Sequence, residues 1–310
     1  MTTTWLILAR AVHIGACLLF FGMFTFDRLV ATAIFKTGKT ETGDFWHARI
    51  RLFSLVLLPV ILLSGILWFG LVAMTMSGSP LQWDILKIVW VQTQFGTVWK
   101  LRLYLWLAAS VFAALYRPQT EPSQKMTWVQ LLLSGGLLGS LAWAGHGQES
   151  SSWHLYADIL HLLVAGLWPA GLLPFVLLLQ HLRRSSEPMR SNFIAVLVRR
   201  FSALSLGSVS LLTITGLVNG WFLVGSPSNL FQQTYGRWLI AKFILFCVII
   251  SIGAINLLRL KPRIMREKPG SHESGTAAAQ LQFNVRAELF LGILIVILVA
   301  VLGILPPANH

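Results

Sequence analysis

Long runs of apolar residues, separated by short polar segments, make up most of this chain of 310 residues. A helical run of about 20 apolar residues is enough to cross the hydrocarbon core of a bilayer. Eight runs come close to or exceed that length, at residues 5–26, 52–76, 99–116, 128–145, 155–180, 202–224, 238–258 and 287–305. They lack the alternation of barrel strands, and a lipid-exposed segment must satisfy its own backbone hydrogen bonds. The pattern therefore predicts an all-α, polytopic integral membrane protein with eight transmembrane helices.

The composition agrees with this prediction. The chain is 55% hydrophobic and 11% charged, whereas about a quarter of the residues of a soluble domain are charged. Lys and Arg number 24 against 11 Asp and Glu, which gives a formal net charge of +13. In a soluble chain this excess would indicate nucleic acid as a partner. Here the basic residues follow the loops, so we expect the chain to meet the lipid bilayer and no nucleic acid.

The basic residues also predict the orientation of the helices. Most of them lie in or beside the loops after the first, third, fifth and seventh predicted helices, at Arg28, Lys36, Lys39, Arg49, Arg51, Arg117, Lys125, Arg183, Arg184, Arg190, Arg199, Arg200, Arg259, Lys261, Arg263, Arg266, Lys268 and Arg286. The other side holds Arg10, Lys87, Lys100, Arg102, Arg237 and Lys242. Because basic loops face the cytoplasm, we expect a multi-pass protein of the bacterial inner membrane with both termini in the periplasm.

The two halves of the chain share short motifs in the same order. The matching pairs are Ala9-x3-His13 with Ala157-x3-His161, Phe53-Ser54 with Phe201-Ser202, Ser64-Gly65 with Thr215-Gly216, and Arg102 with Lys242. They predict a duplication of four plus four helices, a parallel repeat about an axis along the membrane normal. The first half comprises residues 1–127 and the fourth helix up to residue 145, and the second half comprises residues 146–310. Together the halves are expected to form one integral membrane domain, residues 1–310.

Two histidines at matching places in the halves are the first candidate site. His13 and His161 become symmetry mates, and we expect them to face each other across the interface between the halves. Arg10 and Asp158 each lie three residues before their histidine and so share its helical face. A lone charge at this depth is costly. We therefore expect Arg10 and Asp158 to form an ion pair across the interface.

A stripe of polar residues extends this site along the fifth predicted helix. His154, Asp158 and His161 are spaced i, i+4, i+7 and therefore share one face. Asp158 can orient His161 by accepting a hydrogen bond from its ring. His146, at the outer end of the fourth helix, is joined to the stripe by a short loop without Lys or Arg. We predict that the metal ligands are His13, His146, His154 and His161.

Sulfur-containing residues lie near the same histidines. Cys17 is one turn from His13, Met23 lies further along that helix, and Met74 and Met76 end the second helix. These four residues are possible additional ligands. Imidazole, thiolate and thioether together suit copper, above all Cu(I), better than calcium or magnesium. The pattern leaves the oxidation state of copper open.

Several motifs carry a resemblance to a known family. They are Ala144-Gly145-His146, Ala157-Asp158-x2-His161, Ala165-x2-Trp168-x-Ala170-Gly171-Leu172 and Tyr235-Gly236-x5-Lys242. On these residues the chain resembles the copper resistance protein D (CopD/PcoD) family over its whole length, with Ala170 in place of an expected second glycine. The resemblance implies an eight-helix inner-membrane protein of copper resistance. It also implies a periplasmic copper-binding partner of the CopC/PcoC type and movement of copper into the cytoplasm.

The leading hypothesis is therefore copper transport from the periplasm to the cytoplasm, with His146 and His154 receiving the ion before His13 and His161. We expect no enzyme, because the sequence has no phosphate-binding glycine loop, zincin helix or nucleophile elbow. The direction, the driving force and the oligomeric state are left open by the pattern. The sequence also leaves open whether residues 78–97 form a surface-lying amphipathic helix that caps the site or docks the carrier.

Two alternatives stay open beside transport. One is a membrane electron-transfer protein with a b-type haem, for which His13 and His161 are the natural axial ligands. The other is a copper sensor or assembly partner that presents the metal without translocating it.

Overall fold

The fold is described by a computed structural model that covers residues 2–35, 40–115, 124–144, 152–186, 189–266 and 272–308. Within these ranges the chain forms helices and no strand. Eight helical segments are long and apolar enough to cross a membrane. The all-α, polytopic fold class expected from the hydrophobic pattern is therefore confirmed.

The first half of the chain contains four membrane-spanning segments. Their bounds are α1 Thr2–Leu29, α2 Glu41–Ser77, α4 Gln94–Leu115 and α5 Gln124–Gly139, which continues into the 3-10 helix η2 Ser140–Ala144. A short 3-10 helix, η1 (Ala31–Ala33), follows α1, and a short helix, α3 (Trp83–Gln92), lies between α2 and α4. Helix α3 lies within residues 78–97, for which the sequence leaves a surface-lying helix as an open question.

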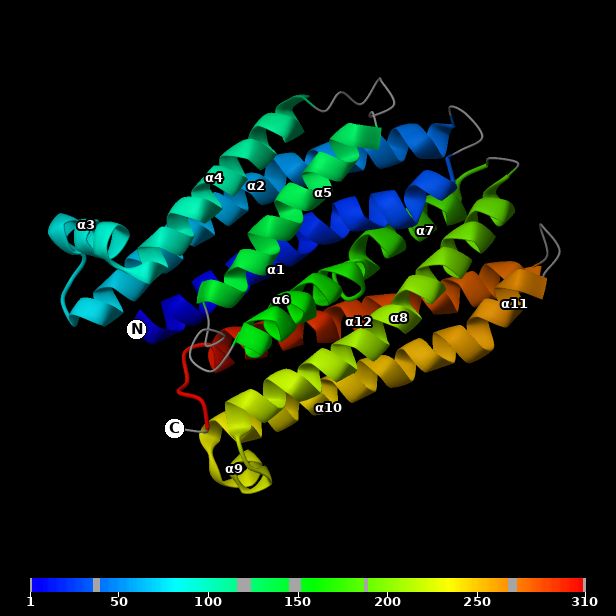
Figure 1. Ribbon diagram of the computed structural model, residues 1–310. Helices are drawn as coiled ribbons and strands as arrows, with labels where there is room; N and C mark the ends of the chain where they lie inside the picture. Colours follow the sequence, from blue (N-terminus) through cyan, green and yellow to red (C-terminus); the bar gives the residue numbers. More distant parts are fainter. Residues whose placement is uncertain are drawn as a thin grey trace.

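The second half contains the other four segments. Its elements are α6 Ser152–Leu167, α7 Leu172–Arg184, α8 Arg190–Val224, α9 Pro227–Gln232, α10 Thr234–Ile255, the π-helical turn η4 Asn256–Leu260, α11 Lys261–Arg266 and α12 His272–Leu302. Both termini, α3 and α9 lie at one end of the bundle (Figure 1). We call this the outer end, because the basic loops predict that it faces the periplasm.

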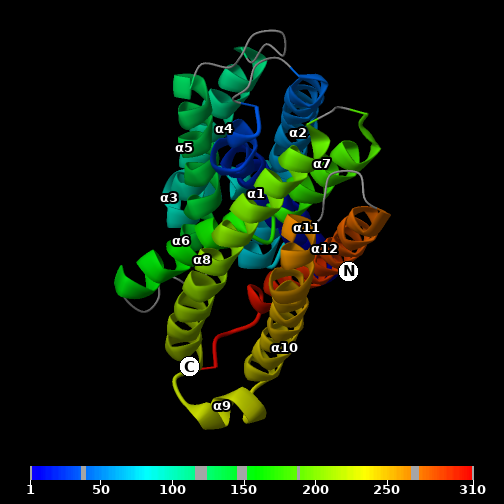
Figure 2. The ribbon, with the colours of Figure 1, turned by 90° about the vertical axis from the view of Figure 1, so that its right-hand side faces the viewer.

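The same packing arrangement occurs in both halves. Helix α1 packs against α2 as α6 packs against α8, and α4 packs against α5 as α10 packs against α12. Figure 2 shows α4 and α5 on one side of α1 and α10 on the other. Helix α1 also packs against α5, α6 and α12, so it joins the two halves.

Helix α2 is longer than a bilayer requires and is capped at both ends. Its 37 residues give a length of about 55 Å at 1.5 Å per residue. At its N-terminus the side chain of Thr40 accepts a hydrogen bond from the backbone N–H of Gly43, at 3.1 Å, which satisfies one of the unpaired first-turn donors. At its C-terminus Gly78 has φ +64° and its N–H donates to the carbonyl of Met74, a left-handed cap that glycine adopts without strain.

The fifth span is present, but it is interrupted. Helix α6 ends at Leu167 and α7 begins at Leu172, with Pro169 in the turn between them. Proline has no N–H to donate and disfavours helix at the residue before it. The chain recovers its hydrogen bonds in a wider turn, in which Ala170 N donates to the carbonyl of Ala165 at 3.2 Å.

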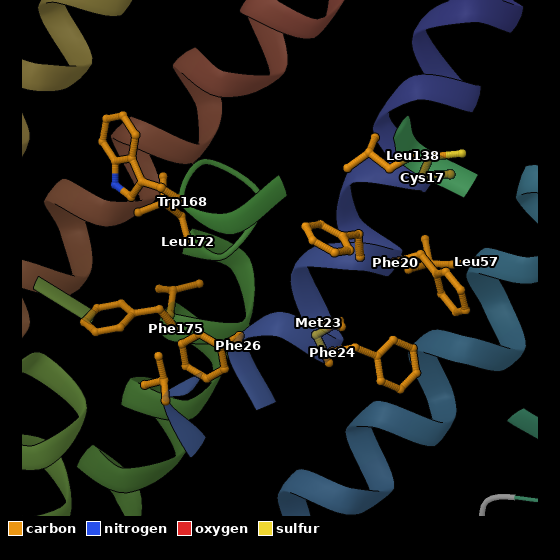
Figure 3. Close-up of a cluster of buried hydrophobic side chains, with 14 of the residues drawn as sticks. Cys17, Phe20, Met23, Phe24, Phe26, Leu57, Leu138, Trp168, Leu172 and Phe175 are labelled. Carbon is orange, nitrogen blue, oxygen red and sulfur yellow. The ribbon is translucent and has the colours of Figure 1, made fainter. Parts of the chain in front are cut away.

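Helix α1 crosses the second half at this interruption. A Cβ atom at Gly22 would lie 2.8 Å from the carbonyl oxygen of Gly166 and 2.9 Å from the methyl carbon of Ala170. Gly22 is therefore required for the close approach. Ala170, where we expected a second glycine, presents its methyl group to Gly22, so the packing compensates for the departure from the family pattern. Figure 3 shows the apolar core around this crossing, with Phe26 of α1 and Phe175 of α7 among its members.

Candidate functional site

His13 lies in the first half, with its ring inside the bundle and 1% exposed. Its Nδ1 is 3.0 Å from the hydroxyl oxygen of Ser64 on α2. The Ser64 hydroxyl already donates to the carbonyl of Val60, at 2.5 Å. Ser64 has a single hydrogen to donate, so the contact with His13 is a donation from Nδ1–H. The lone pair of the His13 imidazole is therefore on Nε2.

Arg102 of α4 occupies the space in front of that lone pair. Its Nη2 is 2.5 Å from Nε2 of His13 and 3.5 Å from Sγ of Cys17. Its Nη1 donates to the carbonyl of Leu137 at 2.7 Å and to the hydroxyl of Ser140 at 2.6 Å. The guanidinium, 2% exposed, thus links α4 to α1 and to the end of α5.

Aromatic side chains frame the histidine. The ring of His13 lies 5.5 Å from that of Trp68 and 5.4 Å from that of Trp99, centroid to centroid. A Cβ atom at Gly65 would lie 2.8 Å from the Trp99 ring and 3.1 Å from Cε1 of His13. Only glycine at position 65 therefore leaves room for both rings. Arg102 also lies over the Trp99 ring, with its guanidinium carbon 5.3 Å from the ring centre.

A cavity of about 610 Å³ reaches this site from between α2, α3 and α4. His13 and Arg102 lie in its wall, together with Gly65, Phe69 and Trp106. The wall is otherwise apolar apart from Lys87 of α3.

His161 occupies the corresponding place in the second half. Its Nδ1 is 2.9 Å from the hydroxyl oxygen of Thr215 on α8, and that hydroxyl donates to the carbonyl of Leu211 at 2.7 Å. The same reasoning gives His161 an Nδ1–H and a lone pair on Nε2. A Cβ atom at Gly216 would lie 3.5 Å from Cε1 of His161, so this glycine also adjoins its histidine but with more space.

A half-buried cation accompanies His161 as well. Lys242 of α10 is the charged group that acts electrostatically on both His161 and Asp158. The carboxylate of Asp158 also accepts a hydrogen bond from the amide of Asn219, at 3.3 Å. Each half thus combines a histidine, a hydroxyl and a glycine from the next long helix, and a basic residue from α4 or α10.

The structure does not bring the two histidines to one site. We expected His13 and His161 to face each other across the interface, but each ring is anchored inside its own half, to α2 and to α8. Among the described residues, no group of three or more His, Cys, Asp or Glu side chains is placed to hold a metal ion. The two histidines belong to two separate sites, which we call the His13 site and the His161 site.

The expected pair of Arg10 and Asp158 is not formed either. The guanidinium carbon of Arg10 lies 4.7 Å from the centre of the Trp68 ring, and its Nη2 packs against Gly303 at the end of α12. The carboxylate of Asp158 is instead served by Asn219 and Lys242. The reason is geometric, because α6 turns this face towards α8 and α10 rather than towards α1.

The remaining candidate ligands lie in different surroundings. His154 is 2% exposed and stacks on Phe222, with centroids 5.1 Å apart. Cys17 is buried beside Arg102, and Met23 is buried in the apolar core below it (Figure 3). Met74 and Met76 lie at the outer end of α2, where Met76 is 60% exposed. His146 lies outside the described residues.

Arg102 and Lys242 are the site residues that sequence reasoning missed. Both were noted as matching positions of the repeat and as charges on the outer side. Each of them follows the same motif in its half of the sequence, Ser64-Gly65 or Thr215-Gly216. This recurrence could have indicated that they belong to the sites, because motifs that recur together in two copies tend to meet in space.

Comparison with known proteins identifies related chains over most of the length. A family model described as copper resistance protein D-like, N-terminal domain, matches residues 1–157, and one described as copper resistance protein D matches residues 195–302. The chain is 32% identical to the copper resistance protein D of Pseudomonas syringae pv. tomato over 258 residues, which cover 79% of this chain and 80% of that protein.

Two further relatives differ in how much of their length is matched. The copper transport protein CutJ of Bacillus subtilis (strain 168) is 30% identical over 233 residues, which are 74% of this chain and 40% of that protein. The inner membrane protein YebZ of Escherichia coli (strain K12) is 25% identical over 312 residues, 98% of each chain.

Proposed function

This chain belongs to the copper resistance protein D family and is a multi-pass protein of the inner membrane, and from that premise we propose that it moves copper ions from the periplasm to the cytoplasm. His13 and His161 are the two places at which the ion rests. The observation that supports this most directly is the matched anchoring of the two imidazoles. In each, a hydroxyl holds Nδ1–H and leaves the Nε2 lone pair for the ion, which is how protein ligands are oriented towards metals.

The basic residue beside each histidine makes these sites weak. Like charges repel strongly where water is excluded, so a copper ion at His13 is destabilised whenever Arg102 is in place. A conducting site must bind well enough to admit the ion and weakly enough to release it. We infer that Arg102 moves away as copper binds and returns as it leaves. Lys242 acts in the same way at the His161 site.

The remaining candidate ligands fit a sequential route in this proposal. His146 and His154 receive copper at the outer end, delivered by a periplasmic copper-binding protein of the CopC/PcoC type. Cys17 lies one turn further inward than His13 and is within reach of the same arginine, so it can accept the ion next. Met23 follows on the same helix. The thiol and the thioether favour Cu(I) on this stretch.

Copper accumulation in cells tests the proposal. His13→Ala and His161→Ala should each lower accumulated copper by about tenfold or more, since even the groups that orient a metal ligand contribute 10–100-fold in affinity. His47→Ala, at the cytoplasmic end of α2, is the matched control and should leave uptake unchanged. Membrane content of each variant is measured alongside. Normal uptake by both site variants would refute the proposal.

The two alternatives make different predictions for the purified protein. A b-type haem needs both Nε2 atoms on one iron, and the hydrogen bonds that tie the rings to separate helix pairs do not favour this. A Soret band with split visible bands after reduction would nevertheless establish it. A sensor or assembly partner would bind copper but fail to move it into reconstituted vesicles, whereas a transporter would fill them.

A further inference from the structure

The cavity beside His13 is too apolar to be the path of a metal ion. Its wall is built from side chains such as Ile66 and Phe69 of α2 and Leu103 of α4. At about 610 Å³ it falls in the usual range of ligand sites. Because its wall is apolar, the cavity suits an apolar molecule from the bilayer.

The charge at the cavity rim indicates which molecule this is. Lys87 of α3 is exposed and is part of the wall, and none of the wall residues is acidic. Trp83 and Trp90 flank it on the same helix, and tryptophan of this kind marks the level of the lipid headgroups. A basic side chain at that level attracts anionic lipid.

We propose that this cavity is a binding site for an anionic phospholipid of the outer leaflet. Lys87 binds the phosphate, and one acyl chain enters between α2 and α4 and ends against the rings of Trp99 and His13. This acyl chain fills the lateral opening and keeps water from reaching His13 by this route. This inference does not depend on the direction of copper transport or on its occurrence.

Gly70 offers a way to block the site without disturbing the helix packing. A Cβ atom at Gly70 would meet only Cδ1 of Leu81, at the ordinary distance of 3.7 Å, and both residues line the cavity. A phenylalanine at position 70 therefore projects into the space meant for the acyl chain. Gly207 of α8 is a matched control, because a Cβ atom there meets nothing within 4 Å and Gly207 is not among the wall residues.

The experiment reconstitutes the full chain in nanodiscs of equal phosphatidylglycerol and phosphatidylcholine and measures by native mass spectrometry which lipid stays bound. The wild type should retain phosphatidylglycerol. Gly70→Phe should lose it, while Gly207→Phe should not. Lys87→Glu should lower the preference for phosphatidylglycerol by about fivefold, and Arg237→Glu, an exposed cation beside α9, should not change it.

Several results would overturn the proposal. These are a wild type that retains no lipid, retention that is equal for the two headgroups, and retention that is unaffected by Gly70→Phe. Retention of a different apolar molecule in place of phospholipid, such as a quinone, would show that the occupant is wrongly identified.

Discussion

Arg102 holds its Nη2 atom 2.5 Å from Nε2 of His13, the nitrogen that a copper ion would use. A permanent cation and a metal ion thus compete for one lone pair. The same guanidinium donates to Leu137 and Ser140 through its other nitrogen. With His13 and Cys17 it has four partners, and it must release some of them to move. In the proposed function, binding of copper at the His13 site would therefore be coupled to the link between α4 and α5.

Removing the charge of Arg102 should allow the His13 site to bind copper more tightly and release it more slowly. In Arg102→Gln the amide keeps hydrogen-bonding capacity but has no charge, so copper bound by the purified protein should be held about tenfold more tightly or better. Copper uptake by cells should fall, because the ion is released slowly. Equilibrium dialysis against a copper chelator measures the affinity, and Arg237→Gln is the control for loss of an exposed cation. Equal affinity in Arg102→Gln and wild type would contradict the gating role.

The hydroxyl anchors should matter to the metal rather than to the fold. Ser64→Ala and Thr215→Val remove the acceptor of Nδ1–H, and each should lower copper affinity at its own site by 10–100-fold. Ser210→Ala removes a hydroxyl that only bonds its own helix, at the carbonyl of Leu206, and should have no effect. Copper titration of the three purified variants makes the comparison. Loss of affinity in Ser210→Ala of the same size would contradict the assignment.

The two glycines beside the histidines should respond differently to the same change. Gly65→Ala places a methyl group 2.8 Å from Trp99, which forces the ring to move and should cost about 1–3 kcal/mol of stability. Gly216→Ala places it 3.5 Å from His161, an ordinary contact, and should be tolerated. The unfolding midpoint of each variant can be measured in detergent, by heating the protein and recording the loss of its monodisperse peak on size-exclusion chromatography. A lower midpoint for Gly216→Ala than for Gly65→Ala would contradict the packing described.

The stability of the fold should depend on the hydrogen bond between the buried carboxyl group of Glu288 and the amide of Asn256. Glu288 of α12, 2% exposed, accepts a hydrogen bond of 2.6 Å from Asn256 in the π-helical turn, and Asn256 accepts one of 2.7 Å from Asn284. Asn256→Leu leaves the carboxyl without this donor and should cost about 1–3 kcal/mol. The double variant with Glu288→Leu should recover most of that loss, which the same unfolding assay would show. No recovery would mean that Asn256 acts through some other contact.

The hydrophobic pattern was sufficient to predict the spans, because a helix in lipid is specified by its own length and composition. The interruption at Pro169 was present in the sequence, but an apolar run hides a local break whose shape depends on α1 packing into it. The site was harder to predict. Ser64 lies 51 positions from His13 and Arg102 lies 89 positions away, so no local spacing reports these contacts.

The internal repeat carried the missing information in part. It aligned Ser64 with Thr215 and Arg102 with Lys242. In the structure Ser64 and Arg102 contact His13, Thr215 contacts His161, and Lys242 acts on His161 through its charge. It was misleading for Arg10 and Asp158, because matching positions in two copies share a local environment and need not touch each other. Across a duplication, the useful inference is that each copy builds its own site.

The crossing of α1 at Gly22 has a mechanical consequence. With backbone against backbone at Gly166 and no space for a methyl group, α1 cannot slide past the interrupted span without pulling it along. We therefore expect any movement of one half against the other to be small at this contact. We expect larger displacements at α3 and α9, which lie at the outer end of the bundle (Figure 1).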